Sequence, residues 1–199
     1  AVFSSAATCE GKTTHFFDSS SVQGDTIQSY FWSLGDASTS SLKNVSHQYS
    51  SKGTYNVRLI VTSGQGCKDT ALSTTTIYDQ PVADFTMTSV CFGEPTQFTD
   101  KSTLSSGTLT YQWDFGDGTG TSTAQNTSYT YKSSGGYTTK LVVTSSDGCI
   151  DSVTNSATVY NLPNADFNFQ NACLNDAVEL TNKSKIGIGS LTYEWTFGD

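Results

Sequence analysis

The feature that most constrains this chain is an internal repeat with a period of 82 residues. The cysteines follow it: Cys9, Cys91 and Cys173 take one position of the repeat, and Cys67 and Cys149 take another. A tryptophan and a Gly-Asp pair recur in step with them. Agreement at one long period is typical of a tandem array in which each copy forms a structural unit. We therefore expect copies at residues 1–82, 83–164 and 165–199, the third incomplete and the natural chain longer.

Residue alternation predicts that each copy is built from β-strands. In the second copy, Leu109–Phe115 places Tyr111, Trp113 and Phe115 on one face and polar side chains on the other. A two-residue period of this kind indicates a strand with one buried face. Further short runs are expected at 83–88, 96–99, 127–131, 136–144 and 152–160. About seven strands separated by Gly- and Asp-rich turns predict an all-β, two-sheet sandwich.

Charge and hydropathy exclude two classes of partner. The net charge is −8, whereas binding to nucleic acid requires a basic face. The apolar runs are far shorter than the roughly 20 residues that span a bilayer. We therefore expect no nucleic-acid partner and no membrane insertion. The segments between copies, Tyr78–Val82 and Tyr160–Asn164, are short and contain proline, which favours a stiff, extended connection.

Two motifs resemble the signatures of PKD domains. Residues Tyr111–Gly118 read YQWDFGDG, which is similar to the first signature of that family. In the first copy, His47-Gln48-Tyr49 precedes Gly53–Val57, which resembles the second signature. The match is not complete, because Tyr129 stands where the family has its histidine in the second copy. The resemblance implies tandem immunoglobulin-like β-sandwiches of the PKD type.

Tandem units with this cysteine pattern also resemble the repeats of very large surface proteins of Bacteroidota, including gliding-motility adhesins. That resemblance implies a secreted, non-catalytic structural or adhesive rod at the cell surface, acting as a stalk, adhesin shaft or filament. Neighbouring repeats and an extracellular polysaccharide or surface protein are then the expected partners. An alternative hypothesis is a spacer or binding accessory region of a secreted hydrolase. A third is self-association into a filament.

Five cysteines in a chain of short strands favour an oxidising compartment. The simplest pairing keeps each bond within one copy, as Cys9–Cys67 and Cys91–Cys149, and leaves the partner of Cys173 outside the chain. A bond between copies, such as Cys67–Cys91, is the less economical alternative. A zinc site is not expected, because the cysteines form neither a Cys-x-x-Cys motif nor a cluster with histidine.

The remaining candidate groups favour structural roles over chemistry. The two histidines, His15 and His47, are replaced by Gln97 and Tyr129 in the second copy, so a catalytic role is not expected. A recurrent turn aspartate is a candidate for Ca²⁺ binding; it occurs as Asp36, Asp117 and Asp199. Because Ca²⁺ takes six to eight oxygen ligands, we favour an aspartate that bonds its own turn, and expect no cofactor.

Three sites match the O-glycosylation signature of Bacteroidota, in which Asp-Ser or Asp-Thr is followed by an apolar residue or threonine. The acceptor hydroxyls would be Thr26, Thr70 and Ser152. Thr70 and Ser152 occupy the same position of the repeat, three residues after its second cysteine. The chain is rich in serine and threonine, so chance matches are a competing explanation.

Overall fold

The computed structural model describes residues 1–198, and these residues form strands and no helix. The prediction of an all-β fold is confirmed. In the first repeat the strands are β1 (Phe3–Ser5), β2 (Thr8–Cys9), β3 (Thr13–Asp18), β4 (Ile27–Ser33), β5 (Thr39–Ser40), β6 (Val45–Gln48), β7 (Gly53–Ser63) and β8 (Lys68–Tyr78). Asp199 lies outside the described residues, so the expectation for that aspartate is not addressed.

The second repeat reproduces this order strand for strand. Its elements are β9 (Phe85–Met87), β10 (Val90–Cys91), β11 (Thr96–Asp100), β12 (Leu109–Asp114), β13 (Thr121–Ser122), β14 (Thr127–Tyr129), β15 (Gly135–Ser145) and β16 (Ile150–Tyr160). The third begins with β17 (Phe167–Phe169) and β18 (Leu180–Asn182). The strands that residue alternation did not predict, β10 and β13, have two residues each, too few to show a period.

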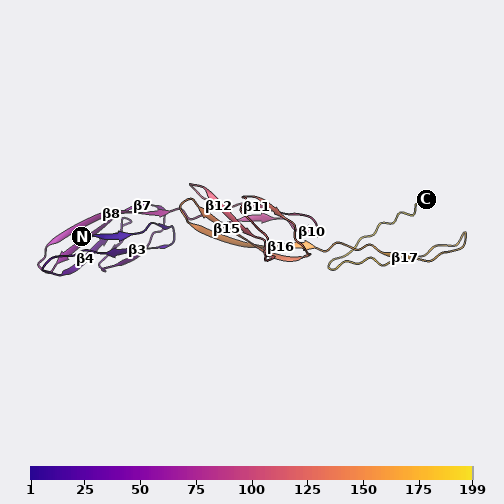
Figure 1. Cartoon of the computed structure of the whole chain (residues 1–199), viewed down its shortest axis with the longest axis horizontal. Coiled ribbons are helices and arrows are strands. Elements are labelled where there is room, and N and C mark those ends of the chain that lie inside the picture. Colours follow the sequence, from indigo (N-terminus) through magenta and orange to yellow (C-terminus); the bar gives the residue numbers. More distant parts are fainter. Residues whose placement is uncertain (199) are drawn as a thin grey trace. The chain divides into compact units, whose positions relative to one another are not determined.

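Each of the first two repeats is a sandwich of a three-stranded and a five-stranded sheet (Figure 1). In the first repeat the strand orders are β1-β3-β6 and β2-β8-β7-β4-β5; in the second they are β14-β11-β9 and β10-β16-β15-β12-β13. The long hairpin of β7 and β8 pairs in continuous antiparallel register, while the short β2 pairs parallel to β8.

The core of each sandwich lies between its two sheets. In the first repeat Phe16 of β3 and Trp32 of β4 are fully buried, with ring centroids 5.9 Å apart. The equivalent Phe98 and Trp113 of the second repeat are 5.7 Å apart. The indole N–H of each tryptophan donates to a backbone carbonyl, at 2.8 Å in both repeats, which satisfies the polar end of a buried ring.

By mutual contacts the chain divides into two compact units that cut across the repeats. One contains Ala1–Ala83 together with Ser102–Thr110 and Val142–Ser152 of the second repeat. The other contains Asp84–Lys101, Tyr111–Leu141 and the chain from Val153 onward. The end of the second sandwich that adjoins the linker is therefore held with the first repeat. Among the described residues, no helix has the length and apolar character needed to cross a membrane.

Candidate functional site

The recurrent Gly-Asp turn is built around the carboxylate of its aspartate. Asp117 accepts bonds from the backbone N–H groups of Thr119 at 3.0 Å and Gly120 at 2.7 Å, and from the hydroxyl of Tyr129 at 2.6 Å. These donors, the Tyr129 hydroxyl first, hold the pKa of Asp117 well below its usual value. In the first repeat, Asp36 occupies this position and bonds His47 at 2.7 Å.

The glycine before the aspartate permits close contact between this turn and a neighbouring strand. Gly116 has φ +79°, and a Cβ there would lie 2.1 Å from the carbonyl oxygen of Thr138. Beside the turn, the buried hydroxyl of Tyr131 donates to the carbonyl of Phe115 at 2.9 Å. Only glycine combines this backbone conformation with this approach, so the signature motif encodes a packed turn.

The aspartate's oxygens are thus engaged by the turn and by the side chain facing it. Within residues 1–198, no group of three or more His, Cys, Asp or Glu side chains is arranged to hold a metal ion. Ca²⁺ binding at this turn stays the less favoured hypothesis.

The disulfide joins the two repeats. Cys9 at the end of β2 bonds Cys149 in the turn between β15 and β16, with Cα atoms 5.8 Å apart. The remaining cysteines of the described chain are exposed free thiols: Cys67, Cys91 and Cys173. The predicted pairs Cys9–Cys67 and Cys91–Cys149 are therefore wrong. The bond is of the alternative kind, between copies, although it is not the Cys67–Cys91 pair.

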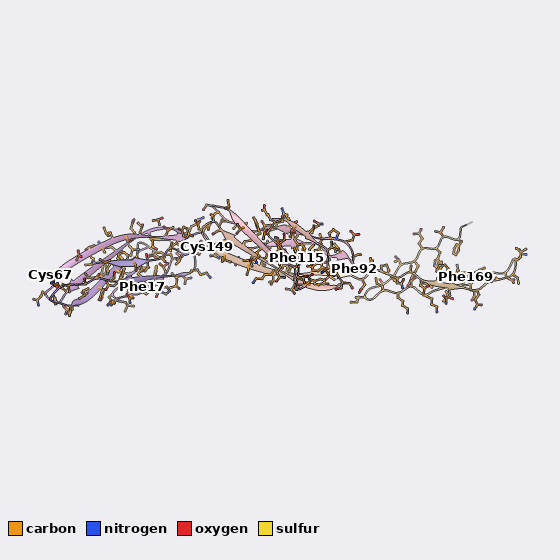
Figure 2. All side chains as sticks on the ribbon, in the orientation of Figure 1. Phe17, Cys67, Phe92, Phe115, Cys149 and Phe169 are labelled. Carbon is orange, nitrogen blue, oxygen red and sulfur yellow. A yellow bond between two sulfur atoms is a disulfide. The ribbon has the colours of Figure 1, made fainter. Side chains whose placement is uncertain are left out.

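Strand geometry explains the correction. Cys9 lies opposite Tyr78, the last residue of β8, whereas Cys67 immediately precedes the first residue of β8. Ten residue steps of extended strand separate Lys68, the first residue of β8, from Tyr78 by about 33 Å. A disulfide requires Cα atoms about 4.4–6.8 Å apart, so the two cysteines of one sandwich cannot bond. Figure 2 labels Cys67 at one end of the first repeat and Cys149, the partner of Cys9, beyond the other end.

Polar contacts of the linker also join the repeats at this junction. Asp79 of the linker accepts a bond from Lys52 at 3.0 Å and from the backbone N–H and hydroxyl of Ser105. The Ser105 hydroxyl, followed by the Lys52 ammonium, holds the pKa of Asp79 below its usual value. A salt bridge and hydrogen bonds of this kind fix geometry rather than activate a reacting group.

Side-chain and backbone groups of the linker are also bonded to the second repeat. The side-chain amide of Gln80 donates to the carbonyl of Ile150 at 2.7 Å, and the backbone N–H of Ala83 donates to Asp151 at 2.8 Å. Val82 and Thr103 exchange two backbone bonds of 2.9 Å. The linker is therefore held along most of its length, and the junction is a restrained joint rather than a free tether.

Comparison with known proteins identifies the repeats. The family model described as PKD domain matches residues 2–77 and again residues 78–160. The chain belongs to the PKD domain family. The PKD1 domain of Vibrio anguillarum Epp is 31% identical over 40% of this chain and 93% of its own, with a TM-score of 0.37. The PKD1 domain of the Vibrio cholerae metalloprotease PrtV is 32% identical over 40% of this chain and 96% of its own, with a TM-score of 0.36.

Membership of the PKD family supports a non-catalytic extracellular domain, and the disulfide agrees with an oxidising compartment. A bacterial ice-binding adhesin also matches, at 14% identity over 80% of this chain and 64% of its own, with a TM-score of 0.35.

The predicted glycosylation sites of these PKD repeats lie on the surface. Thr26 precedes β4, Thr70 lies in β8 and Ser152 lies in β16, and all three are exposed. Glycosylation stays a prediction.

The junction residues Lys52, Asp79 and Ser105 were missed by sequence reasoning. They carry no motif, and their equivalents one period later are Ser134, Asn161 and Gly187, so repetition does not single them out.

Proposed function

We propose that this chain is a load-bearing structural segment of a cell-surface protein, in which PKD repeats act as the shaft of a stalk or adhesin. The observation that carries the proposal is the Cys9–Cys149 bond, because it joins successive repeats covalently. Noncovalent joints between domains separate under tension, whereas a disulfide holds until it is reduced.

The position of the bond determines which part of the chain bears force. Tension that enters before Cys9 and leaves after Cys149 passes directly through the two sulfur atoms. The intervening segment, across a sequence separation of 140, lies outside the load path. Most of both hydrophobic cores is thereby shielded from mechanical unfolding, as a shaft under shear requires.

Single-molecule force spectroscopy tests this function. Pulled from its two ends, the oxidised chain is expected to extend little beyond its terminal segments. After reduction, each molecule should release roughly 480 Å more contour length, from about 3.4 Å for each of the shielded residues. The variant Cys67→Ser is the matched control and should not change the oxidised trace. Equal extension with and without reductant would contradict the proposal.

Further proposals concern the setting of the shaft. We infer that it stands outside the cell, contacts extracellular polysaccharide or another surface protein, and serves adhesion or gliding. The alternative is an accessory region of a secreted hydrolase. The sequence beyond residues 1 and 199 separates them, since many further 82-residue repeats favour the shaft and a neighbouring catalytic domain favours the accessory region.

Glycosylation at Thr26, Thr70 and Ser152 is proposed on the match to the signature and on the exposure of all three residues. Intact-mass measurement of protein purified from its host is the test. Hexose-containing adducts, of which one disappears in the variant Thr70→Val, support the proposal; an unmodified mass contradicts it.

A further inference from the structure

We propose that Cys9–Cys149 is one of a periodic series of disulfides between successive repeats, in which the first cysteine of each repeat bonds the turn cysteine of the repeat that follows. Cys91 then bonds the turn cysteine of the third repeat, 82 residues beyond Cys149. This inference does not depend on the proposed function, because an accessory region of an enzyme could be interlocked in the same way.

Cys91 occupies the same structural position as Cys9. Cys9 ends β2, which pairs parallel to β8 and lies opposite Tyr78; Cys91 ends β10, which pairs parallel to β16 and lies opposite Tyr160. The next backbone N–H donates to the carbonyl of the opposing tyrosine at 2.8 Å in both repeats. Cys91 is exposed and forms no disulfide with any cysteine among residues 1–198.

The second junction begins in the same way as the first. Asn164 and Lys185 exchange backbone bonds of 2.8 and 2.9 Å, as Val82 and Thr103 do one period earlier. The Lys183 N–H donates to the carbonyl of Asp166 at 2.7 Å, matching the Lys101–Asp84 bond of 2.8 Å. The start of the third repeat is therefore attached to its linker as the start of the second is.

The side chains of this second junction also meet. Asn161, which stands where Asp79 does, accepts a hydrogen bond from Ser134, which stands where Lys52 does. A neutral pair thus replaces an ion pair at the same location. A repeat docked here in the manner of the second would bring its turn cysteine to Cys91.

Within its own repeat, Cys91 has no partner that it can reach. The turn cysteine of the second repeat is already bonded to Cys9, and all of β16 separates that turn from Cys91. By the same rule, Cys67 occupies the turn position of the first repeat and would receive the first cysteine of a preceding repeat.

Formation of the new bond is an oxidation. The two thiols lose two protons and two electrons as the sulfur–sulfur bond forms. An oxidised protein disulfide of the export compartment accepts them by thiol–disulfide exchange and leaves as a dithiol. The substrate of the reaction is the docked pair of thiols.

The test is non-reducing peptide mapping of the natural protein and of a chain continued to the end of its third repeat, both made under oxidising conditions. The expected map contains Cys9–Cys149 together with a peptide that joins Cys91 to the turn cysteine of the third repeat. In the 199-residue chain, iodoacetamide should label Cys91 in the native state, and this labelling should be lost in the continued chain.

Two variants of the continued chain keep the result decisive. Cys91→Ser should leave the turn cysteine of the third repeat as a free thiol, while Cys67→Ser should leave the other bonds unchanged. Limited proteolysis establishes that the third repeat is folded. A folded third repeat whose turn cysteine bonds Cys173, or a Cys91 that remains free, would overturn the proposal.

Discussion

Replacing Cys9 with serine should destabilise the second repeat as well as the first. When the second repeat unfolds alone, its chain from Ala83 to Cys149 is a loop with both ends held by the first repeat. For a loop of about 65 residues, the chain-entropy relation gives a stabilisation of about 4 kcal/mol, which the variant loses. Cys9 is preferred for the substitution because Cys149 is buried and its replacement would also change packing.

The measurement is urea denaturation followed by tryptophan fluorescence, since Trp32 and Trp113 are fully buried in their respective repeats. The controls are Cys67→Ser and Cys91→Ser, which alter exposed free thiols and should change the free energy of unfolding by less than about 0.5 kcal/mol. Bonds within each repeat would make these controls as damaging as Cys9→Ser. Such a result, or a loss below about 1 kcal/mol for Cys9→Ser, would refute the reasoning.

Three further predictions concern the signature turn of the second repeat. Asp117→Asn should lower the free energy of unfolding by about 1–3 kcal/mol at neutral pH and make that free energy less sensitive to acid. The measurement is a urea titration repeated from pH 7 to pH 2. The control Asp147→Asn, which changes an exposed aspartate, should have neither effect. The sign follows from the lowered pKa of Asp117: its stabilisation is present above the usual carboxyl pKa of 3.8 and is lost as the pH falls toward the folded-state pKa. Gly116→Ala should cost about 1–3 kcal/mol more than Gly118→Ala, because both glycines have positive φ but only the first Cβ would strike a backbone carbonyl; equal melting temperatures would contradict this. Tyr131→Phe should cost about 1–2 kcal/mol in calorimetry, since a buried carbonyl loses its donor, and an unchanged melting temperature would count against that bond.

The fold could be predicted from local pattern because residues close together in the sequence determine where strands and turns form and which face of each strand is buried. The alternation through Trp113 identified a strand with one buried face, and that tryptophan is fully buried in the structure. The 82-residue period carried this interpretation from one copy to the next. The Gly-Asp turn was correctly interpreted as self-bonded because an aspartate reaches backbone N–H groups two and three residues ahead.

The disulfide partner of each cysteine could not be predicted from local pattern. Spacing along the chain favoured Cys9–Cys67 as the economical pair, but a disulfide depends on distance in space. The ionic contact of Lys52 with Asp79 could likewise not be predicted from the sequence, since neither residue belongs to a recurring motif.

The amino-acid sequence by itself thus determined that this protein is a tandem array of β-sandwiches, because periodicity and turn chemistry act over a few residues. Only the tertiary structure decided that the covalent bond crosses from one sandwich to the next. The physical reason is strand direction: β8 and β16 each run the full length of a sandwich, which sends the two cysteines of one repeat to opposite ends and brings Cys9 against the turn of its neighbour.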